Sequence, residues 1–264
     1  MSQILAGKTA LILGVANRWS IAYAIAQAFT REGAELILTY QSDRQKQTVE
    51  ELADGLKVRQ VISCDVSQDD QIDTLTNELK GSGAVLNAVV HSIAFANRED
   101  LSRPFLETTR EGFKLAHDVS AYSLVAVARA TAPLMAAKDQ GGGSLMTLSF
   151  LGSQRVVQNY NVMGVAKAAL ESTVRYLAND LGPANIRVNA ISAGAVKTTS
   201  ARGIRDFSKM LDGVAAISPL RRITEPAEVA DTAVFLASDL GRGVTGNILY
   251  VDAGFQIMGL AIQA

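Results

Sequence analysis

The sequence has very few of the residues that form disulfides or bind metals. Among its 264 residues there is one cysteine, Cys64, and there are two histidines, His91 and His117. A single cysteine cannot form a disulfide within the chain, and this set is too small for a zinc cluster or a multi-histidine site. We therefore expect no metal site, and we expect both histidines to pack in the core or against a bound cofactor.

The sequence also lacks an excess of either charge and lacks a long apolar run. The 25 basic and 26 acidic residues give a net charge of -1, which indicates neither nucleic acid nor a basic partner. The longest strongly apolar stretch, residues 121–137, is short for a membrane span and contains Arg129. The first residues do not have the pattern of a signal peptide. These observations predict a cytoplasmic protein that binds neither nucleic acid nor membrane.

Short apolar runs alternate with segments of helical length along the whole chain. The runs predict strands at residues 9–14, 35–40, 58–63, 86–93, 144–150, 186–193 and 248–251. The segments between them predict helices at residues 20–33, 43–55, 68–80, 109–137, 164–181 and 226–237. Continuously apolar strands are typical of a sheet that is covered on both faces.

This alternation predicts an α/β protein with right-handed parallel crossovers. We expect a single Rossmann-like, doubly wound domain over residues 1–264, in which helices flank a parallel sheet of about seven strands. No repeat or linker interrupts the pattern. Residues 194–214 form the longest stretch without clear regular structure in the C-terminal half, directly after a strand, which favours a lid over the ligand crevice.

The turn after the first predicted strand has features of an anion site. Gly14 permits a tight turn, and Ser20 is suited to begin a helix whose free amides face a phosphate. The usual G-x-G-x-x-G pattern is absent, so an ordinary strand–turn–helix is equally compatible with these residues. After the second strand, Gln41 offers no carboxylate to a ribose. After the third, Asp65 is suited either to accept from an adenine amino group or to cap a turn.

Tyr160 and Lys167 form the most informative pair. They are seven residues apart, about two helical turns, so both can lie on one side of a helix. A lysine beside a phenol favours the ionised phenol and can hold a ribose through hydrogen bonds. Taken alone, such a pair is also common on the solvent-exposed face of a helix.

Over nearly its whole length the chain resembles the short-chain dehydrogenase/reductase superfamily and, within it, the enoyl-[acyl-carrier-protein] reductases of bacterial fatty acid synthesis. The matching stretches include His91-Ser-Ile-Ala-Phe-Ala96, Tyr160-Asn-Val-Met-Gly-Val-Ala-Lys167 and Arg187-Val-Asn-Ala-Ile-Ser-Ala-Gly194, together with residues 14–22, 39–41, 64–66 and 251–255. Typical short-chain dehydrogenases have the lysine four residues after the tyrosine, where this chain has Gly164. The longer gap is that of the enoyl reductases.

The resemblance implies hydride transfer from NADH to a trans-2-enoyl thioester. It implies Tyr160 and Lys167 as catalytic residues, and Ala96 with Tyr160 as substrate-binding residues. The cofactor-binding residues that it implies are Gly14, Ser20, Ile21, Gln41, Asp65, Val66, Ile93, Lys167, Val196, Lys197, Thr198, Thr199 and Ser200. NADPH stays open, because Gln41 offers no cation to a 2′-phosphate but Arg44 lies close in sequence.

The resemblance further implies an acyl-carrier-protein-bound substrate and a homotetramer with contacts through the helices near residues 109–137 and 164–181. We expect Arg202, Arg205 and Lys209 either to meet the acidic carrier or to form a solvated helix face. Two departures from the family are Phe150, where many members have a second tyrosine, and Ala195, where proline is common. Two other functions stay open: a short-chain reductase of another conjugated or carbonyl substrate, and a non-catalytic nucleotide-binding regulator.

Overall fold

A computed structural model describes residues 3–198 and 207–259 of the chain. Seven strands form one parallel sheet in the order β3-β2-β1-β4-β5-β6-β7. The strands are β1 (Thr9–Leu13), β2 (Glu35–Tyr40), β3 (Val58–Ser63), β4 (Ala88–His91), β5 (Gly143–Ser149), β6 (Ile186–Ala193) and β7 (Ile248–Val251). The predicted Rossmann-like sheet of seven strands is confirmed. The strand order reverses between β1 and β4, which is where such sheets bind nucleotides.

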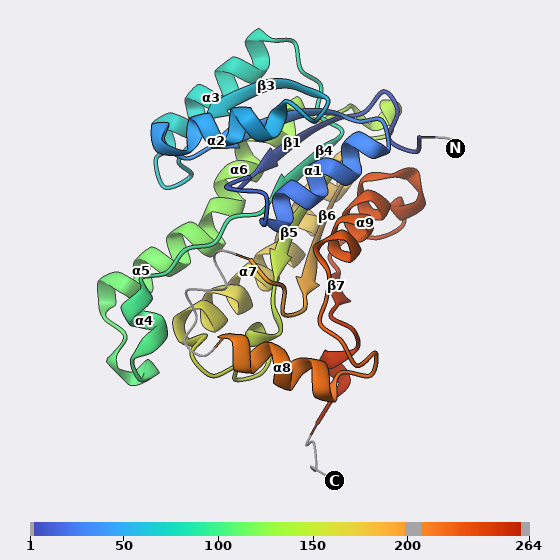
Figure 1. The fold of residues 1–264 in the computed structure, drawn as a ribbon. Coiled ribbons are helices and arrows are strands. Elements are labelled where there is room, and N and C mark those ends of the chain that lie inside the picture. Colours follow the sequence, from blue (N-terminus) through green and yellow to red (C-terminus); the bar gives the residue numbers. More distant parts are fainter. Residues whose placement is uncertain (1–2, 199–206, 260–264) are drawn as a thin grey trace.

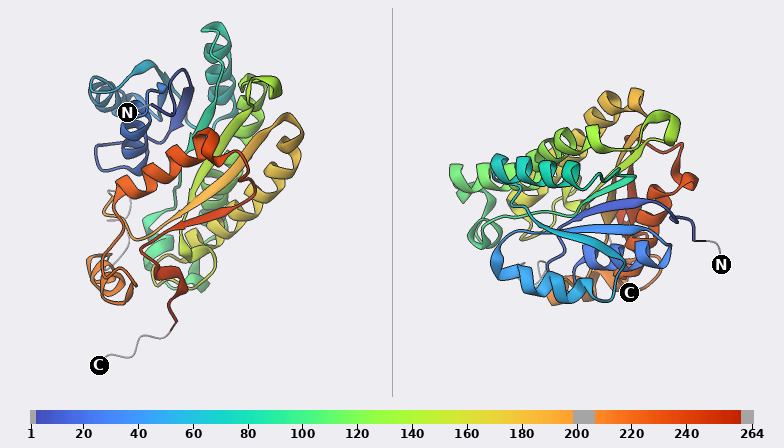
Figure 2. Two further views of the ribbon diagram at one scale, coloured as in Figure 1. Left: turned by 90° about the vertical axis from the view of Figure 1, so that its right-hand side faces the viewer. Right: turned by 90° about the horizontal axis from the view of Figure 1, so that it is seen from above.

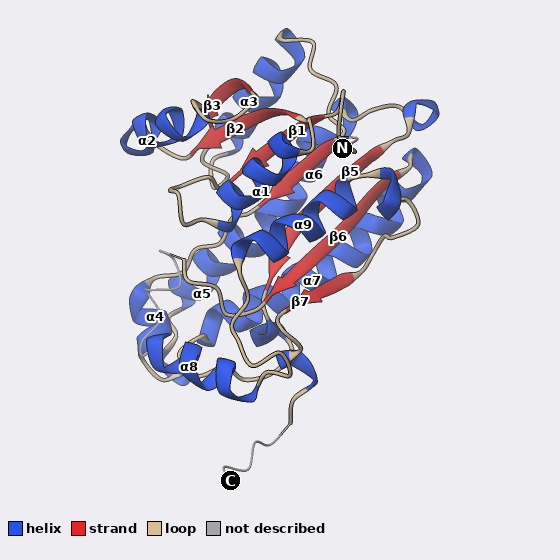
Figure 3. Ribbon diagram, turned by 45° about the vertical axis from the view of Figure 1, so that its right-hand side comes forward, coloured by secondary structure: helices blue, strands red, loops and turns tan. Residues whose placement is uncertain are grey.

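Helices cover both faces of the sheet, so the molecule has three layers (Figure 2). One face packs against α1 (Ile21–Arg31), α2 (Asp43–Ala53) and α9 (Pro226–Ala237), of which α1 and α9 lie in front of the sheet in Figure 3. The other packs against α3 (Asp69–Gly81), α6 (Ser123–Thr131) and α7 (Asn161–Leu181). Each interface is a separate core of aliphatic side chains, which explains the continuously apolar strands.

The long predicted helix at residues 109–137 is a chain of shorter elements. It consists of α5 (Arg110–His117), a π-helical turn (Asp118–Tyr122), α6 and a 3-10 turn (Ala132–Leu134). The π turn places Ser120 against the backbone of Phe95, whose N–H donates to the Ser120 hydroxyl while that hydroxyl lies 3.0 Å from the Phe95 carbonyl. Single π turns of this kind occur often at functional sites.

Besides small shifts at the ends of other elements, the structure differs from the sequence-based expectations at three further helices. Helix α7 begins at Asn161 and not at residue 164, so Tyr160 lies at its N-cap. Helix α4 (Arg98–Ser102) was not predicted. Helix α8 (Phe207–Ile217) covers the end of the segment that we expected to be irregular, and it lies beyond the carboxyl ends of β5, β6 and β7 (Figure 1). The rest of that segment up to residue 206 includes Thr199, Ser200, Arg202 and Arg205, which lie outside the described residues.

No helix among the described residues is long and apolar enough to span a membrane. Within residues 3–198 and 207–259, no group of three or more histidine, cysteine or carboxylate side chains is arranged to bind a metal.

Candidate active site

Two adjoining cavities open at the carboxyl ends of the strands. The first has a volume of about 590 Å³ and lies among the ends of β5 and β6, the start of α7 and α8. The second has a volume of about 470 Å³ and lies among the ends of β1, β2, β3 and β4. Ala94 and Phe95 line both cavities, so the loop after β4 separates two compartments of one crevice.

The turn after β1 brings the backbone close to the end of β4. Gly14 has φ +98°, and a Cβ there would lie 2.0 Å from the Ser92 carbonyl oxygen. A side chain is therefore excluded, and the turn after β1 packs directly against the backbone after β4. Ser20 is the N-cap of α1, and its hydroxyl accepts from the Tyr23 amide at 3.2 Å. The first turn of α1 contains no acidic residue, so its amino end keeps a positive potential toward an anion.

Gln41 and Asp65 meet at the wall of the 470 Å³ cavity. The Gln41 side-chain amide donates to Asp65 Oδ2 at 3.1 Å, and Asp65 Oδ1 accepts from the Ser67 amide at 3.0 Å and from the Ser67 hydroxyl at 2.8 Å. Burial raises the pKa of the Asp65 carboxyl, but these hydrogen bonds outweigh it, and the net pKa is below its usual value. Asp65 thus forms a turn and also presents an ionised acceptor to the cavity.

Tyr160 stands at the start of α7 on the wall of the 590 Å³ cavity. Its neighbours Asn159 and Asn161 have φ +62° and +38°, a left-handed backbone that asparagine tolerates better than most residues. Its ring meets the edge of the Phe150 ring at 4.9 Å between centroids. Burial raises the pKa of the hydroxyl, which is therefore neutral and able to donate a proton in a hydrogen bond at ordinary pH.

Lys167 lies two turns further along α7 and is 5% exposed. Its ammonium donates to the Leu148 carbonyl at 2.7 Å, which uses one of its three donors and is its one hydrogen bond among the described residues. Burial lowers the pKa of Lys167 to about 8, while the Glu171 carboxylate acts in the opposite direction. Lys167 is thus a buried cation near the end of β5.

Gly164 lies between them, at the fourth position after Tyr160. A Cβ at Gly164 would lie 2.7 Å from the Gly152 carbonyl oxygen, so the backbone after β5 occupies the space that a side chain would need. A lysine four residues after the tyrosine, as in typical short-chain dehydrogenases, therefore has no room here.

Comparison with known protein families identifies the family of this chain. The family model for enoyl-(acyl carrier protein) reductase matches residues 14–256. The chain belongs to the enoyl-[acyl-carrier-protein] reductase family. It is 50% identical to the enoyl-[acyl-carrier-protein] reductase [NADH] of Bacillus cereus over 97% of this chain and 100% of the relative. It is 49% identical to that of Escherichia coli K12 over 96% and 95% of the two chains.

Solved structures of this enoyl reductase family agree with the fold. The Bacillus cereus enoyl-acyl carrier protein reductase, in a complex with NADP+ and indole naphthyridinone, matches with a TM-score of 0.94 and 50% identity over 98% of this chain and 100% of that chain. The Anaplasma phagocytophilum reductase in complex with NAD matches with a TM-score of 0.92 and 42% identity over 98% and 96%.

The structure brings most of the residues predicted from the enoyl reductase resemblance to the two cavities. Ile21, Ala96, Val196 and Thr198 join Tyr160 around the larger cavity, and Val66 and Ile93 join Gly14, Gln41 and Asp65 around the smaller. Three predicted residues line neither cavity: Lys197 is exposed, Lys167 is buried, and Ser20 lies at the start of α1 as its N-cap. Thr199 and Ser200 lie outside the described residues.

Sequence reasoning missed several residues that line the larger cavity: Phe95, Leu101, Ser149, Met163 and Met210. Met163 follows Tyr160 by three residues, so helical periodicity would have found it. Ser149 ends β5, a predicted strand, and Met210 lies in α8, whose apolar residues recur with helical spacing, so both could have been found. Phe95 lies in a loop and Leu101 in the short α4, for which the sequence carried no comparable signal.

The two histidines have different positions. His91 is buried, with its ring nitrogens 3.0 Å from the Thr147 hydroxyl and 2.8 Å from the Ser123 hydroxyl, as the prediction of a packed histidine requires. For His117 that prediction was wrong. It is half-buried on α5 and stacks on Phe113, with ring centroids 4.0 Å apart. Cys64 is buried, which raises the pKa of its thiol to about 12 and makes it unreactive.

Proposed function

We propose that this chain reduces the trans-2 double bond of enoyl thioesters carried on acyl-carrier protein, with NADH as the hydride donor. The observation that carries the proposal is the pair formed by Tyr160 on the wall of the 590 Å³ cavity and the buried Lys167, with no space for a side chain at Gly164 between them. This excludes the catalytic spacing of ketoacyl reductases and supports the enoyl chemistry named for the relatives.

The residues present fit a nicotinamide dinucleotide. We assign the adenosine half to the cavity of Gly14, Gln41, Asp65, Val66 and Ile93, with the pyrophosphate at the start of α1 near Ser20 and Ile21. We assign the nicotinamide half to Lys167 and to residues Val196, Lys197, Thr198, Thr199 and Ser200. When bound, the reduced nicotinamide supplies the hydride to C3 of the substrate.

The chain's own part is to bind, orient and polarise. The thioester carbonyl gains negative charge as C3 is reduced, and we assign the Tyr160 hydroxyl as the donor that stabilises this oxygen. Lys167 holds the nicotinamide ribose through its two remaining donors. C2 receives its proton from Tyr160 directly or through a water. Ala96 lines the acyl side of the cavity, whose walls are largely apolar.

NADH is favoured over NADPH on the chemistry of the β2 end. Gln41, at the end of β2 where we assign the ribose, donates its side-chain amide to Asp65 and offers no positive charge. The structure of a relative contains NADP+, and in this chain Arg44 is exposed on α2. We therefore include a minor use of NADPH in the proposal.

We further propose a cytoplasmic homotetramer that receives its substrate from the carrier protein. The support for the tetramer is an uncharged stripe on the outer face of α7, made of Val165, Ala168, Ala169, Ser172, Thr173 and Tyr176. Tyr176 is 73% exposed and Val165 is 39% exposed on this stripe. A continuous face of small and apolar side chains favours contact with a second helix. Lys209, exposed on α8, is the described member of the proposed carrier-facing basic set.

The test follows NADH and NADPH oxidation with a trans-2-enoyl thioester, with a 3-ketoacyl thioester as the control substrate. We expect enoyl-dependent oxidation of NADH, no turnover of the ketoacyl thioester, and a loss of about 10²- to 10³-fold in kcat for Tyr160→Phe, the scale of one oxyanion donor. A wild type that binds NADH but turns over neither substrate would favour the non-catalytic regulator. Turnover of the ketoacyl thioester alone would favour another short-chain reductase.

A further inference from the structure

The described residues include a buried carboxylate that neither the sequence pattern nor the mechanism above uses. Glu171 lies one turn after Lys167 on α7 and is 4% exposed. It forms no ion pair within the described residues. Instead its Oε1 accepts from the Ser149 hydroxyl and from the Ser153 hydroxyl, each at 2.6 Å. Burying a carboxylate this deeply costs free energy of desolvation unless hydrogen bonds compensate for it. We infer that Glu171 is there for a specific role.

The two serines lie at the two ends of the segment that backs Tyr160. Ser149 ends β5 and lines the larger cavity, and Ser153 ends the following 3-10 turn (Leu151–Ser153). Between them, the Phe150 ring meets the Tyr160 ring edge-on. A Cβ at Gly152 would lie 2.4 Å from Tyr160 Cδ1, which shows how closely the backbone approaches the ring.

We propose that Glu171 is a positioning residue of the active site. Through Ser149 and Ser153 it holds the segment that packs behind Tyr160, and its carboxylate acts on the Lys167 ammonium. One carboxylate thereby links the proton donor and the ribose-binding cation, although it touches neither cavity. This inference rests on the proposed function.

Several charged and titratable groups surround Lys167 and Glu171. On α7 itself, Glu171 opposes the burial that lowers the pKa of Lys167 to about 8. From β4, His91 faces Lys167, and burial together with that charge lowers the pKa of His91 to about 3, so His91 is neutral. Because the depressed pKa belongs to a cation, the Lys167 charge is complete below pH 8 and is lost as the pH rises through about 8.

From β7, Tyr250 faces Glu171. Burial raises the pKa of Tyr250, the Glu171 and Asp252 carboxylates raise it further, and Gln154 and Arg155 lower it. Tyr250 and Tyr160 are therefore neutral in the range where Lys167 titrates. Glu171 is the carboxylate that acts on the Lys167 ammonium, so replacing it with glutamine moves the loss of the Lys167 charge to lower pH.

The experiment compares Glu171→Gln with the double variant Ser149→Ala/Ser153→Ala. Glutamine keeps a carbonyl oxygen for the serines but removes the charge, whereas the double variant keeps the charge and removes both hydrogen bonds. Glu78→Gln is the matched control, because Glu78 is a helical carboxylate on α3 that accepts from Gln60 at 3.0 Å, far from the cavities.

Hydrogen exchange of the cofactor-free proteins gives the first readout. We expect faster exchange of the amides of residues 150–164 in the double variant, and wild-type exchange in Glu78→Gln. The second readout is kcat with the enoyl thioester, which we expect to fall about 10- to 100-fold in the double variant, because a small misplacement of a reacting group has effects of this size. The KM for NADH stays close to the wild-type value.

The pH dependence of NADH binding gives the third readout. Wild-type affinity is expected to fall as the pH rises through about 8, and this fall moves to lower pH in Glu171→Gln only. The proposal is overturned if the double variant has wild-type exchange and wild-type kcat, or if Glu171→Gln leaves the pH dependence unchanged. If Glu171→Gln does not fold, the double variant decides. Failure of the proposed function shows separately, as absent enoyl turnover in the wild type with normal exchange.

Discussion

A single missing atom, the Cβ of Gly164, decides the packing of α7 between Tyr160 and Lys167. Its absence leaves room for the Gly152 carbonyl, and Gly152 in turn leaves room for the Tyr160 ring. Two glycines thus allow the chain after β5 to lie directly against α7. The departure at Phe150 fits this packing, because its ring acts through edge contact with Tyr160 and needs no hydroxyl for it.

Gly164→Ala tests this packing. The added methyl group meets a backbone oxygen, which cannot move as a flexible side chain would, so we expect a loss of about 1–3 kcal/mol in the free energy of unfolding, together with a lower kcat. Gly213→Ala is the control, because Gly213 lies in α8, where an added Cβ would meet nothing within 4 Å. That variant should gain about 0.5–1 kcal/mol from helix propensity. Equal urea midpoints for both variants would contradict the packing argument.

His91 makes the stability of the fold depend on pH. Its ring is enclosed by Thr147 and Ser123, and burial, together with the Lys167 charge, lowers its pKa from 6.5 to about 3. The unfolded chain therefore binds a proton between pH 6.5 and 3 that the folded chain does not. It follows that the stabilisation by neutral His91 is complete above pH 6.5 and decreases as the pH falls toward 3.

We expect this group alone to lower the free energy of unfolding by about 2 kcal/mol between pH 7 and pH 5. The measurement is urea unfolding of the wild type and of His91→Gln at pH 7, 6 and 5. Glutamine does not titrate, so the difference in stability between the two proteins should shrink by that amount on acidification. A difference that stays constant with pH would contradict a buried neutral His91.

At the scale of elements, the parallel sheet was predictable because strands that are buried on both faces are continuous apolar runs in the sequence. The seven predicted strands correspond to the seven observed, with differences at the ends of β1, β4 and β5. Of the missed elements, α8 did carry a helical period, because its apolar residues Met210, Leu211 and Val214 recur at the spacing of one helix face, whereas the other two had no such signal. Helix α4 has five residues, too few for a period of 3.6, and the π turn makes a tertiary contact between Ser120 and Phe95 that the local sequence does not reveal.

The same distinction applies to the candidate site. Gly14 and Asp65 follow strands, and Tyr160 and Lys167 lie two turns apart along α7, so their placement near the carboxyl ends of the strands follows from topology. Glu171 gave no signal, because its role depends on Ser149 and Ser153, which only the folded chain brings to it. Residues that act through a tertiary contact are thus the ones that sequence reasoning misses.

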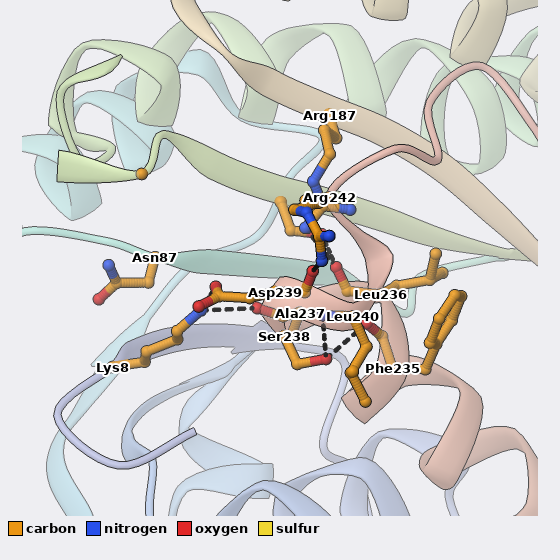
Figure 4. Close-up of polar contacts among 12 residues, drawn as sticks. Lys8, Asn87, Arg187, Phe235, Leu236, Ala237, Ser238, Asp239, Leu240 and Arg242 are labelled. Carbon is orange, nitrogen blue, oxygen red and sulfur yellow. Dashed lines mark hydrogen bonds and ion pairs between the residues drawn. The ribbon is translucent and has the colours of Figure 1, made fainter. Parts of the chain in front are cut away.

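The carboxyl end of α9 depends on cations from other elements (Figure 4). Arg187 from β6 donates to the Leu236 carbonyl, to which the Ser144 hydroxyl also donates at 2.9 Å. Lys8 reaches the Ala237 carbonyl at 3.4 Å and Asp239 at 2.7 Å. These groups satisfy carbonyls that the helix itself cannot, and they lie at the amino ends of the strands, opposite the cavities.

Arg187→Met should therefore destabilise the fold without changing the chemistry. We expect a loss of about 1.5–3 kcal/mol, the scale of a hydrogen bond to a charged group, with kcat unchanged at low temperature. Arg242→Met is the control. Exposed Arg242 donates to the Asp239 carbonyl, three residues earlier, and makes no other side-chain hydrogen bond within residues 3–198 and 207–259, so its loss should cost less than about 0.5 kcal/mol. Thermal melts with parallel enoyl assays check both. A melting point of Arg187→Met equal to that of Arg242→Met would contradict this account of the α9 cap.

At the scale of the whole molecule, α7 contributes both to the candidate active site and to the proposed contact between subunits. Its inner face holds Lys167 and Glu171 against the sheet, while the uncharged stripe from Val165 to Tyr176 faces outward. If this stripe is covered by a second copy, the helix that bears the catalytic pair is held from both sides. Assembly would then restrain the position of Tyr160 as well as the subunits.

Ala168→Glu tests this coupling. A carboxylate in the middle of a covered stripe would be buried without a partner, which strongly disfavours association. We expect sedimentation velocity to give about four times the chain mass of 28.0 kDa for the wild type and smaller species for the variant, with a lower kcat. Thr48→Glu adds the same charge on the exposed face of α2 and should leave both mass and kcat unchanged. A wild type that sediments as a single chain would overturn the tetramer. A variant that stays tetrameric would place the contact on another face, and a dissociated variant with wild-type kcat would show that α7 holds Tyr160 in place without help from a neighbouring subunit.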